Sequence, residues 1–231
     1  FRITNDRHKL SDVKLLTPTE PQQIWCPGVN YAEYVDSAPS CHGNRGVELC
    51  PSSHPEPWLK GRNALIGPGD YIVIPKDSPG EVHYEGEVVA VISRECRRVA
   101  PQEASKYILG YCCGNDISER TWQKEDPTPW RAKGSDSFAP VGPWVETQVN
   151  PSDLEMIVKL NGREVQRSNT RQMLHSFGVI VSYISQHITL QPGDMVFSGA
   201  TGATSLMKPG DIVEVEVTGI GVLSNPVRAE D

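Results

Sequence analysis

The chain has 231 residues, 38% of them hydrophobic, and a formal net charge of −7. This length supports one domain with a sizeable core, and the acidic balance argues against nucleic-acid binding, which requires a basic surface. No apolar run approaches the ~20 residues of a membrane-spanning helix, and no signal-peptide pattern is visible. We therefore expect a cytoplasmic protein that binds neither nucleic acid nor membranes. The six cysteines lack metal-binding spacing, which favours free thiols.

The first half of the chain alternates turn signals with short apolar runs. A Pro-Gly-Asp triplet at 68–70 precedes a predicted strand at 71–74, because Pro and Gly suit the two central positions of a type II turn. Another strand is expected at 87–92. A helix is predicted over 101–109, where Pro101 begins it and Gly110 ends it. Ser118 is the expected cap of a short helix that runs to Lys124.

The second half contains more strands and one longer helix. Strands are expected at 144–146 and 155–160, and Asn161-Gly162 predicts a hairpin into 163–166. Apolar residues at helical spacing predict an amphipathic helix over 173–187. Two further Pro-Gly-Asp triplets predict strands at 195–197 and 212–217. Since strands outnumber helices and show no βα alternation, we predict an α+β fold with a mixed or antiparallel β core.

Two glutamates stand two residues apart at the start of the 87–92 strand. Residues i and i+2 share one face of a strand, so Glu85 and Glu87 are expected side by side, with Val89 and Val91 continuing that face. Gly86 between them would let another backbone or a ligand approach. Such a glutamate pair is also common on solvated strands. The continuous apolar run after it favours a buried pair with a cation between the carboxylates.

A third carboxylate, Asp116, precedes the short helix predicted from Ser118. It would either assist the helix cap or complete a site with Glu85 and Glu87. Three carboxylates without a Cys/His cluster suit a hard cation, Mg²⁺ or Mn²⁺. Because such a site stays negative after a dication binds, an anionic substrate needs further positive groups, for which Arg120 and Lys133 are candidates.

An ordered series of motifs resembles the fumarylacetoacetate hydrolase family. The match opens at Gly28-x-Asn30-Tyr31 and covers about residues 24–227. It assigns 24–231 to a catalytic domain of this type, with 38–57 as a lid or loop and 1–23 as an N-terminal remnant or appendage. The other matching motifs, in order, are Tyr84-Glu85-Gly86-Glu87, Asn115-Asp116-Ile117-Ser118-x-Arg120-x-x-Gln123, Lys133-Gly134-x-Asp136-x-Phe138-x-Pro140-x-Gly142-Pro143-Trp144, Asn161-Gly162, Leu190-x-Pro192-Gly193-Asp194 and Gly219-Ile220-Gly221.

The resemblance implies a β-rich mixed-sheet roll with a few short helices, usually assembled as a homodimer. It places Mg²⁺ or Mn²⁺ on Glu85, Glu87 and Asp116. It implies a 2-oxo or 1,3-dioxo acid substrate whose C–C bond is cleaved, by hydrolysis or decarboxylation, through a metal-stabilised enolate, or which is tautomerised. Lys133 matches a lysine that polarises a substrate oxygen or relays a proton. The expected substrate-binding residues are Arg120, Gln123, Tyr31 and Thr201.

The sequence departs from the family where hydrolytic members carry a water-activating His–Glu pair. Tyr34 and Ser37 occupy those two positions, and tyrosine, with an unperturbed pKa ≈ 10, is a poor base at neutral pH. A second departure is Ala200, where the family has a hydroxyl residue; Thr201 or Ser198 would then stand in for it.

Three interpretations of the missing pair stay open. In the first, the chemistry needs no such pair, as in decarboxylation or keto–enol isomerisation. In the second, a lid histidine, His42 or His54, replaces the base. A longer branch of the family carries an acid and a downstream histidine, an arrangement that Glu33 and His42 fit. In the third interpretation the protein only binds. The candidate catalytic residues are therefore Lys133, His42, Tyr34 and Glu33.

Overall fold

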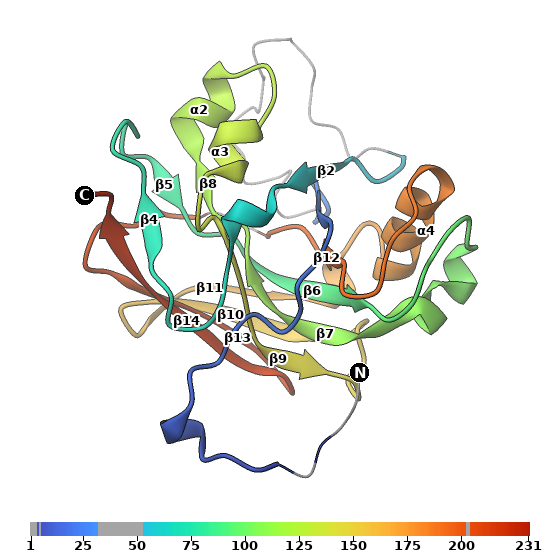
Figure 1. The fold of residues 1–231 in the computed structure, drawn as a ribbon. Helices are drawn as coiled ribbons and strands as arrows, with labels where there is room; N and C mark the ends of the chain where they lie inside the picture. The colour runs from blue at the N-terminus through green and yellow to red at the C-terminus, as the bar shows by residue number, and fades with distance from the viewer. Residues whose placement is uncertain (1–3, 5, 32–52, 202–203) are drawn as a thin grey trace.

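The computed structural model describes residues 4, 6–31, 53–201 and 204–231, which form two curved β-sheets with short helices at their margins (Figure 1). The larger sheet curls into a half-barrel, and the smaller sheet packs against its outer face. The predicted α+β mixed-sheet roll is thus confirmed. In the described ranges, no helix combines the length and apolarity that crossing a bilayer requires.

The larger sheet has seven strands and mixes both directions of pairing. Pairing is parallel between β1 and β12 and between β3 and β9, and antiparallel elsewhere. In spatial order the strands are β2 (Pro57–Lys60), β1 (Ile24–Pro27), β12 (Met195–Phe197), β6 (Gly86–Ile92), β7 (Ile108–Asn115), β9 (Ala139–Glu146) and β3 (Leu65–Ile66).

The smaller sheet has five strands, and a two-stranded ribbon lies beside the helices. The five are β11 (Arg163–Asn169), β10 (Glu155–Leu160), β13 (Ile212–Val217), β14 (Gly221–Ala229) and β4 (Ile72–Ile74), of which β14 and β4 are parallel. The ribbon pairs β5 (Val82–His83) with β8 (Ser118–Glu119). The sequence did not predict seven of the strands, which are β1, β2, β3, β5, β7, β8 and β14.

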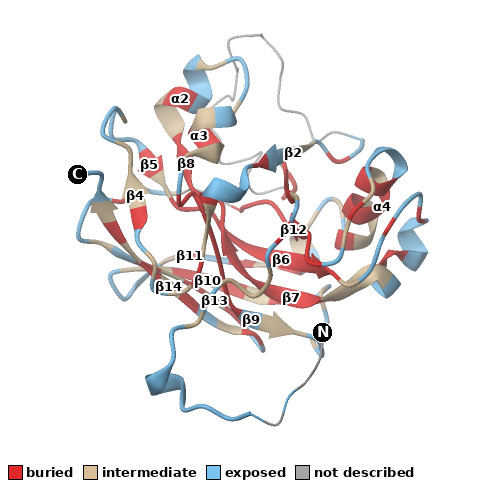
Figure 2. Ribbon diagram, viewed as in Figure 1, coloured by how far each residue is buried: buried red, intermediate tan, exposed pale blue. Residues whose placement is uncertain are grey.

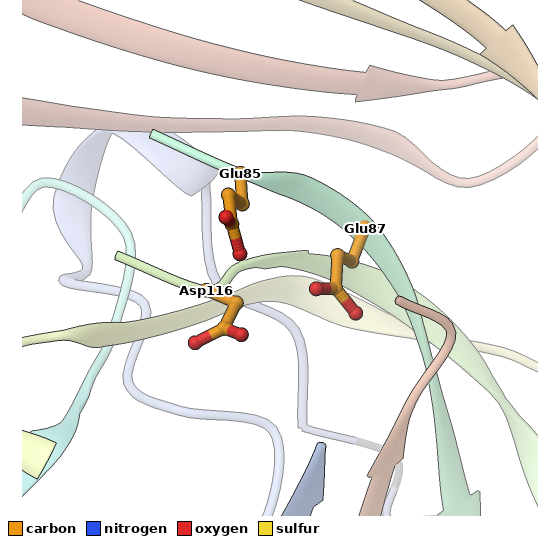
Figure 3. Close-up of side chains that lie close together, drawn as sticks. All are labelled: Glu85, Glu87 and Asp116. Atoms are coloured by element: carbon orange, nitrogen blue, oxygen red, sulfur yellow. The ribbon is translucent and has the colours of Figure 1, made fainter. Parts of the chain in front are cut away.

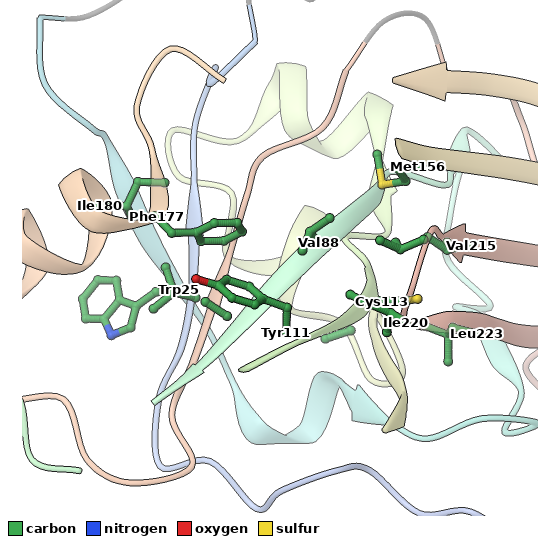
Figure 4. Close-up of a cluster of buried hydrophobic side chains, with 14 of the residues drawn as sticks. Trp25, Val88, Tyr111, Cys113, Met156, Phe177, Ile180, Val215, Ile220 and Leu223 are labelled. Atoms are coloured by element: carbon green, nitrogen blue, oxygen red, sulfur yellow. The ribbon is translucent and has the colours of Figure 1, made fainter. Parts of the chain in front are cut away.

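Strand β6 is buried on both faces, and its alternation divides the core in two. Val88, Ala90 and Ile92 join the cluster between the two sheets, whereas Val89 and Val91 point into the hollow of the half-barrel. Figure 4 shows the first cluster, and Figure 2 shows that buried residues follow the central strands of both sheets. This double burial explains why residues 87–92 form an unbroken apolar run after Glu87.

The local turn predictions are confirmed. Gly69, Gly193 and Gly210 have φ of 76°, 91° and 94°, as the third position of a type II turn requires. In each triplet the aspartate carboxylate also accepts the backbone N–H of the residue three positions earlier, at 3.0, 2.7 and 2.7 Å. Asn161 and Gly162 both have positive φ (54° and 77°), which is the hairpin conformation expected of Asn-Gly.

The helices differ from their predictions mainly at their ends. The expected 101–109 helix is a 3-10 helix, η3 (Pro101–Tyr107), because its last residues enter β7. Ser118 lies in β8, and Glu119 caps α2 (Arg120–Glu125) by accepting the Trp122 N–H at 2.6 Å. The other helices are α3 (Trp130–Gly134), α4 (Phe177–His187), and the 3-10 helices η1 (Leu10–Asp12), η2 (Arg62–Ala64) and η4 (Thr170–Gln172).

Helix α4 is shorter than predicted because Ser176 caps it, whereas Met173 forms a bridge with Tyr31. The N-terminal segment is tied to the domain through Asp194, whose Oδ1 accepts the N–H groups of Gln22 and Gln23 at 2.9 and 2.8 Å. Of the predicted lid at 38–57, residues 38–52 lie outside the described residues, and Pro57 begins β2. The four described cysteines are buried free thiols.

Candidate metal centre

Three carboxylates converge at the point where β6 begins and β7 ends (Figure 3). Glu85 directly precedes β6, Glu87 lies on it, and Asp116 directly follows β7, so the antiparallel pairing of Gly86 with Asn115 brings them together. The Asp116 N–H donates to the Glu85 carbonyl at 2.8 Å. One oxygen from each side chain lies within 4.8 Å of the others. Their exposures are 4%, 1% and 1%.

The neighbouring residues show which face of the strand the pair uses. Glu87 shares a face of β6 with Val89 and Val91, which point into the half-barrel, as the period of two residues predicts. Gly86 points the other way, and a Cβ there would lie 2.4 Å from Val158 Cγ2 of the smaller sheet. Gly86 therefore allows close packing of the two sheets, so of the two expected partners it is another part of the chain that approaches it.

Three cationic side chains surround the carboxylates. The Lys133 ammonium donates to Glu85 and, at 2.7 Å, to Asp116 Oδ2. Arg120 Nη2 lies 2.5 Å from Glu85 Oε1, and Lys60 Nζ lies 2.6 Å from Asp116 Oδ1. Glu87 instead accepts the Gly199 N–H at 2.6 Å. The opposite charges offset the cost of burying each carboxylate.

These charges give the two glutamates different pKa values. Burial opposes ionisation of Glu85, yet Arg120 and Lys133 outweigh it and lower its pKa to about 2. Burial raises the pKa of Glu87 well above its usual value, and the charges of Asp116 and Glu85 add to the effect. Burial also works against the charge on Lys133, but Asp116 and Glu85 raise the pKa of this lysine above its ordinary value. Lys133 is thus a cation and a hydrogen-bond donor here.

The donor set fits a hard dication. It consists of carboxylate oxygens, which Mg²⁺ and Mn²⁺ prefer. Asp116 Oδ1 is buried and accepts no hydrogen bond from the described residues, so its lone pairs remain available to a cation. Glu85, Glu87 and Asp116 are the residues that would hold the ion.

Of the predicted substrate-binding residues, Arg120, Gln123 and Tyr31 lie beside this cluster. Arg120 Nη1 donates to Gln123 Oε1 at 2.7 Å, so these two side chains face together on α2 as expected. Tyr31 is buried beside Ser198, and both burial and the charge of Glu87 raise the pKa of its hydroxyl. Thr201 is also buried, with its Oγ1 3.3 Å from Gln166 Nε2.

Of the candidate bases, the structure describes only His54. Glu33, Tyr34 and His42, with Ser37, lie outside the described residues. His54 is exposed and stacks on Tyr183 of α4, with ring centroids 5.4 Å apart.

Sequence reasoning missed two residues of the site, Lys60 and Trp58. Both come from β2, and the Trp58 ring centroid lies 5.4 Å from Lys133 Nζ. A single lysine after a short apolar run carries no local signal of a buried ion pair, because its partner Asp116 is distant in the sequence. Only the pairing of β2 with β1 places it there.

A family model described as fumarylacetoacetate (FAA) hydrolase C-terminal matches residues 23–228. The chain belongs to the fumarylacetoacetate hydrolase family. A solved 5-carboxymethyl-2-hydroxymuconate delta-isomerase from Mycobacterium smegmatis is 38% identical with a TM-score of 0.88, over 99% of this chain and 87% of that one.

Two other family members bear on the metal and the reaction. A maleylpyruvate hydrolase from Sphingobium sp. SYK-6, solved with manganese(II) and pyruvate, is 30% identical with a TM-score of 0.80, over 96% of this chain and 76% of that one. A Xenopus laevis protein named oxaloacetate tautomerase fahd2, mitochondrial, is 31% identical over 242 residues, covering 97% of this chain and 72% of that protein. The family thus includes a hydrolase, an isomerase and a tautomerase.

Proposed function

We propose that this chain is a divalent-metal-dependent enzyme that cleaves a C–C bond of a 2-oxo or 1,3-dioxo acid, by hydrolysis or decarboxylation, through an enolate. The observation that carries the proposal is the buried trio of Glu85, Glu87 and Asp116, with ligand oxygens within 4.8 Å of one another and cations beside them. The manganese and pyruvate in the related maleylpyruvate hydrolase support the same ion and substrate class. Mg²⁺ or Mn²⁺ bound there would act as a Lewis acid that stabilises negative charge on substrate oxygens.

The surrounding side chains would bind the substrate and stabilise its charge. The Arg120 guanidinium offers donors to the substrate carboxylate, and Gln123, in contact with Arg120, would face the same group. Lys133 Nζ, held as an ammonium, would donate a hydrogen bond to the oxygen that becomes negative as the enolate forms. Tyr31 and Thr201 are proposed to line the substrate pocket. Glu33, Tyr34 and His42 remain the proposed candidates for handling the proton of water.

A second candidate function is isomerisation or tautomerisation of the same substrates. Tyr34 and Ser37 replace the water-activating pair of the hydrolytic members. Two relatives carry the names isomerase and tautomerase. Moving a proton between carbon and oxygen requires the same stabilised enolate but no activated water, so the site supports this chemistry too. The third candidate is a non-catalytic family member that only binds such acids.

Product analysis separates these functions. We would load the protein with Mn²⁺, add oxaloacetate or an acylpyruvate, and follow the mixture by NMR. Pyruvate with a second acid indicates hydrolysis, pyruvate with CO₂ indicates decarboxylation, and keto–enol exchange alone indicates tautomerisation. If no 2-oxo acid turns over, the chain is a binder. Glu85→Gln should lose both bound metal and turnover, and a variant that keeps both would refute the metal centre.

We further propose a homodimer, as the family resemblance implies, and a cytoplasmic location, which the free thiols favour. Light scattering coupled to size exclusion tests the assembly, since a dimer has twice the mass of one chain. A monomeric mass at micromolar concentration would contradict it.

A further inference from the structure

A buried lysine, Lys60 at the end of β2, lies behind the carboxylates. Its side chain is 0% exposed. Its ammonium contacts the backbone oxygens of Ile117, Lys133 and Phe138 at 3.2, 2.5 and 2.7 Å. A lysine ammonium has three N–H donors, and these three carbonyls suffice to accept them all. The backbone therefore holds Lys60 as a charged group in a fixed position.

The fourth neighbour of this ammonium is a predicted metal ligand. Lys60 Nζ lies 2.6 Å from Asp116 Oδ1, yet that oxygen accepts no hydrogen bond from the residues that the structure describes. The contact is therefore a close ion pair, which places the positive charge of Lys60 directly beside a predicted metal ligand. Asp116 Oδ2 is held separately by Lys133, at 2.7 Å.

The buried charges of the site balance. The three carboxylates Glu85, Glu87 and Asp116 face three cations, since Arg120 and Lys133 contact Glu85 and Lys60 contacts Asp116. With all three carboxylates ionised, as binding of the metal requires, these formal charges cancel, so a bound dication leaves two positive charges. Burial keeps water from screening them, which makes each charge count more than it would at a surface.

We propose that Lys60 is a specificity-determining residue whose charge makes the metal-loaded site select ligands with two negative charges. Such ligands are a 2-oxo dicarboxylate or the enolate of a 2-oxo monocarboxylate. The inference rests on the proposed metal centre and adds the charge of its substrate. The same positive charge repels the metal, so Lys60 weakens metal binding to the empty site and strengthens ligand binding to the loaded one.

This pair of opposite effects distinguishes a charge role from a structural one. If Lys60 served only to satisfy three carbonyls, replacing it would loosen the site and weaken the binding of both metal and ligand. If its charge matters, replacing it strengthens the binding of the metal and weakens the binding of the anion. The two affinities then move in opposite directions within one variant.

The test measures both affinities by calorimetry. The full chain is stripped of metal and titrated with Mn²⁺, and the loaded protein is then titrated with oxalate or oxamate, which match in shape but carry two charges and one. In Lys60→Met we expect Mn²⁺ affinity to rise about ten-fold and oxalate affinity to fall about ten-fold, with a smaller fall for oxamate. Lys60→Arg keeps the charge and should retain more oxalate affinity than Lys60→Met. Lys208→Met, at an exposed lysine, is the matched control and should change neither affinity.

The outcomes distinguish a wrong inference about Lys60 from a wrong metal centre. Two affinities that fall together, or that do not change, overturn the inference and leave the proposed function standing. Wild-type protein that binds no Mn²⁺ overturns the metal centre itself. If Lys60→Met does not fold, Lys60→Gln, which keeps a neutral donor, replaces it. The loaded wild type must in any case prefer oxalate over oxamate more strongly than free Mn²⁺ does, and an equal preference refutes the inference without any variant.

Discussion

Lys133 Nζ donates to Asp116 Oδ2 at 2.7 Å and also to Glu85, so one ammonium bridges two of the three clustered carboxylates. The lysine comes from the short helix α3, whereas its partners come from the ends of two paired strands. Because a buried cation between two carboxylates is stabilised in its charged form, we expect Lys133 to act through its charge and its N–H groups and not as a neutral base.

Replacing this lysine should remove catalysis while sparing the metal. In Lys133→Met the three carboxylates remain, so we expect Mn²⁺ affinity to be kept or increased. We expect kcat to fall about 100-fold or more, because the donor to the developing negative oxygen is lost. Steady-state kinetics on the substrate found by NMR would measure this, with exposed Lys106→Met as control. Unchanged kcat would remove Lys133 from the proposed mechanism.

Metal binding should release a proton. Without metal, the raised pKa of Glu87 keeps this buried carboxyl protonated at pH values where an exposed glutamate is ionised. The metal binds the ionised form, so its affinity should fall as pH falls through the pKa of Glu87. Glu85, with a pKa of about 2, stays ionised and adds no dependence above roughly pH 3. Calorimetry in two buffers of different ionisation enthalpy counts the protons, and identical heats would contradict the prediction.

A methyl group at Gly86 should disturb the packing of the two sheets. In Gly86→Ala the new Cβ would lie 2.4 Å from Val158 Cγ2, and such overpacking costs about 1–3 kcal/mol. Because Gly86 separates Glu85 from Glu87, Mn²⁺ affinity should fall as well. Gly134→Ala is the matched control, since a Cβ there meets nothing within 4 Å. Urea unfolding measures both variants, and equal stabilities would contradict this account of Gly86.

The cap of α2 should couple stability to substrate binding. Glu119 is buried and accepts the N–H groups of Trp122 at 2.6 Å and Glu81 at 3.1 Å, which fixes the helix that carries Arg120. Glu119→Ala should destabilise the protein by about 1–2 kcal/mol and raise KM more than it lowers kcat. Glu119→Gln keeps one acceptor oxygen and should recover part of the stability. A variant with unchanged KM would show that the Glu119 cap does not position Arg120 for substrate binding.

Several features were predictable from the sequence because they depend on neighbouring residues. The Pro-Gly-Asp and Asn-Gly turns form from local φ preferences, and the shared face of Glu85 and Glu87 follows from the period of a strand. Helix ends were less predictable. Residues 108 and 109 extend the helical pattern of 101–107, yet they lie in β7, where Ile108 pairs with Ile92 of β6, since ladder hydrogen bonds outweigh a weak helical preference.

The role of Asp116 could not be predicted from its neighbours in the sequence. Its residue type left two roles open, a helix cap or a third metal ligand, and the order of the family motifs favoured the ligand role beside Glu85 and Glu87. The β6–β7 register then supplies the physical reason, because it sets Asp116 against the backbone of Glu85.

The sequence by itself determined the turns, the strand face that carries two carboxylates, and the family. The tertiary structure alone decided the charge of the site, because Lys60 reaches Asp116 through the pairing of β2 with β1 and not through any sequence pattern. The tertiary structure also decided the role of Gly86, because the smaller sheet packs directly against it. Local periodicity sets the direction of a side chain, whereas its buried neighbours depend on which distant strands pair, and no short stretch of sequence carries that information.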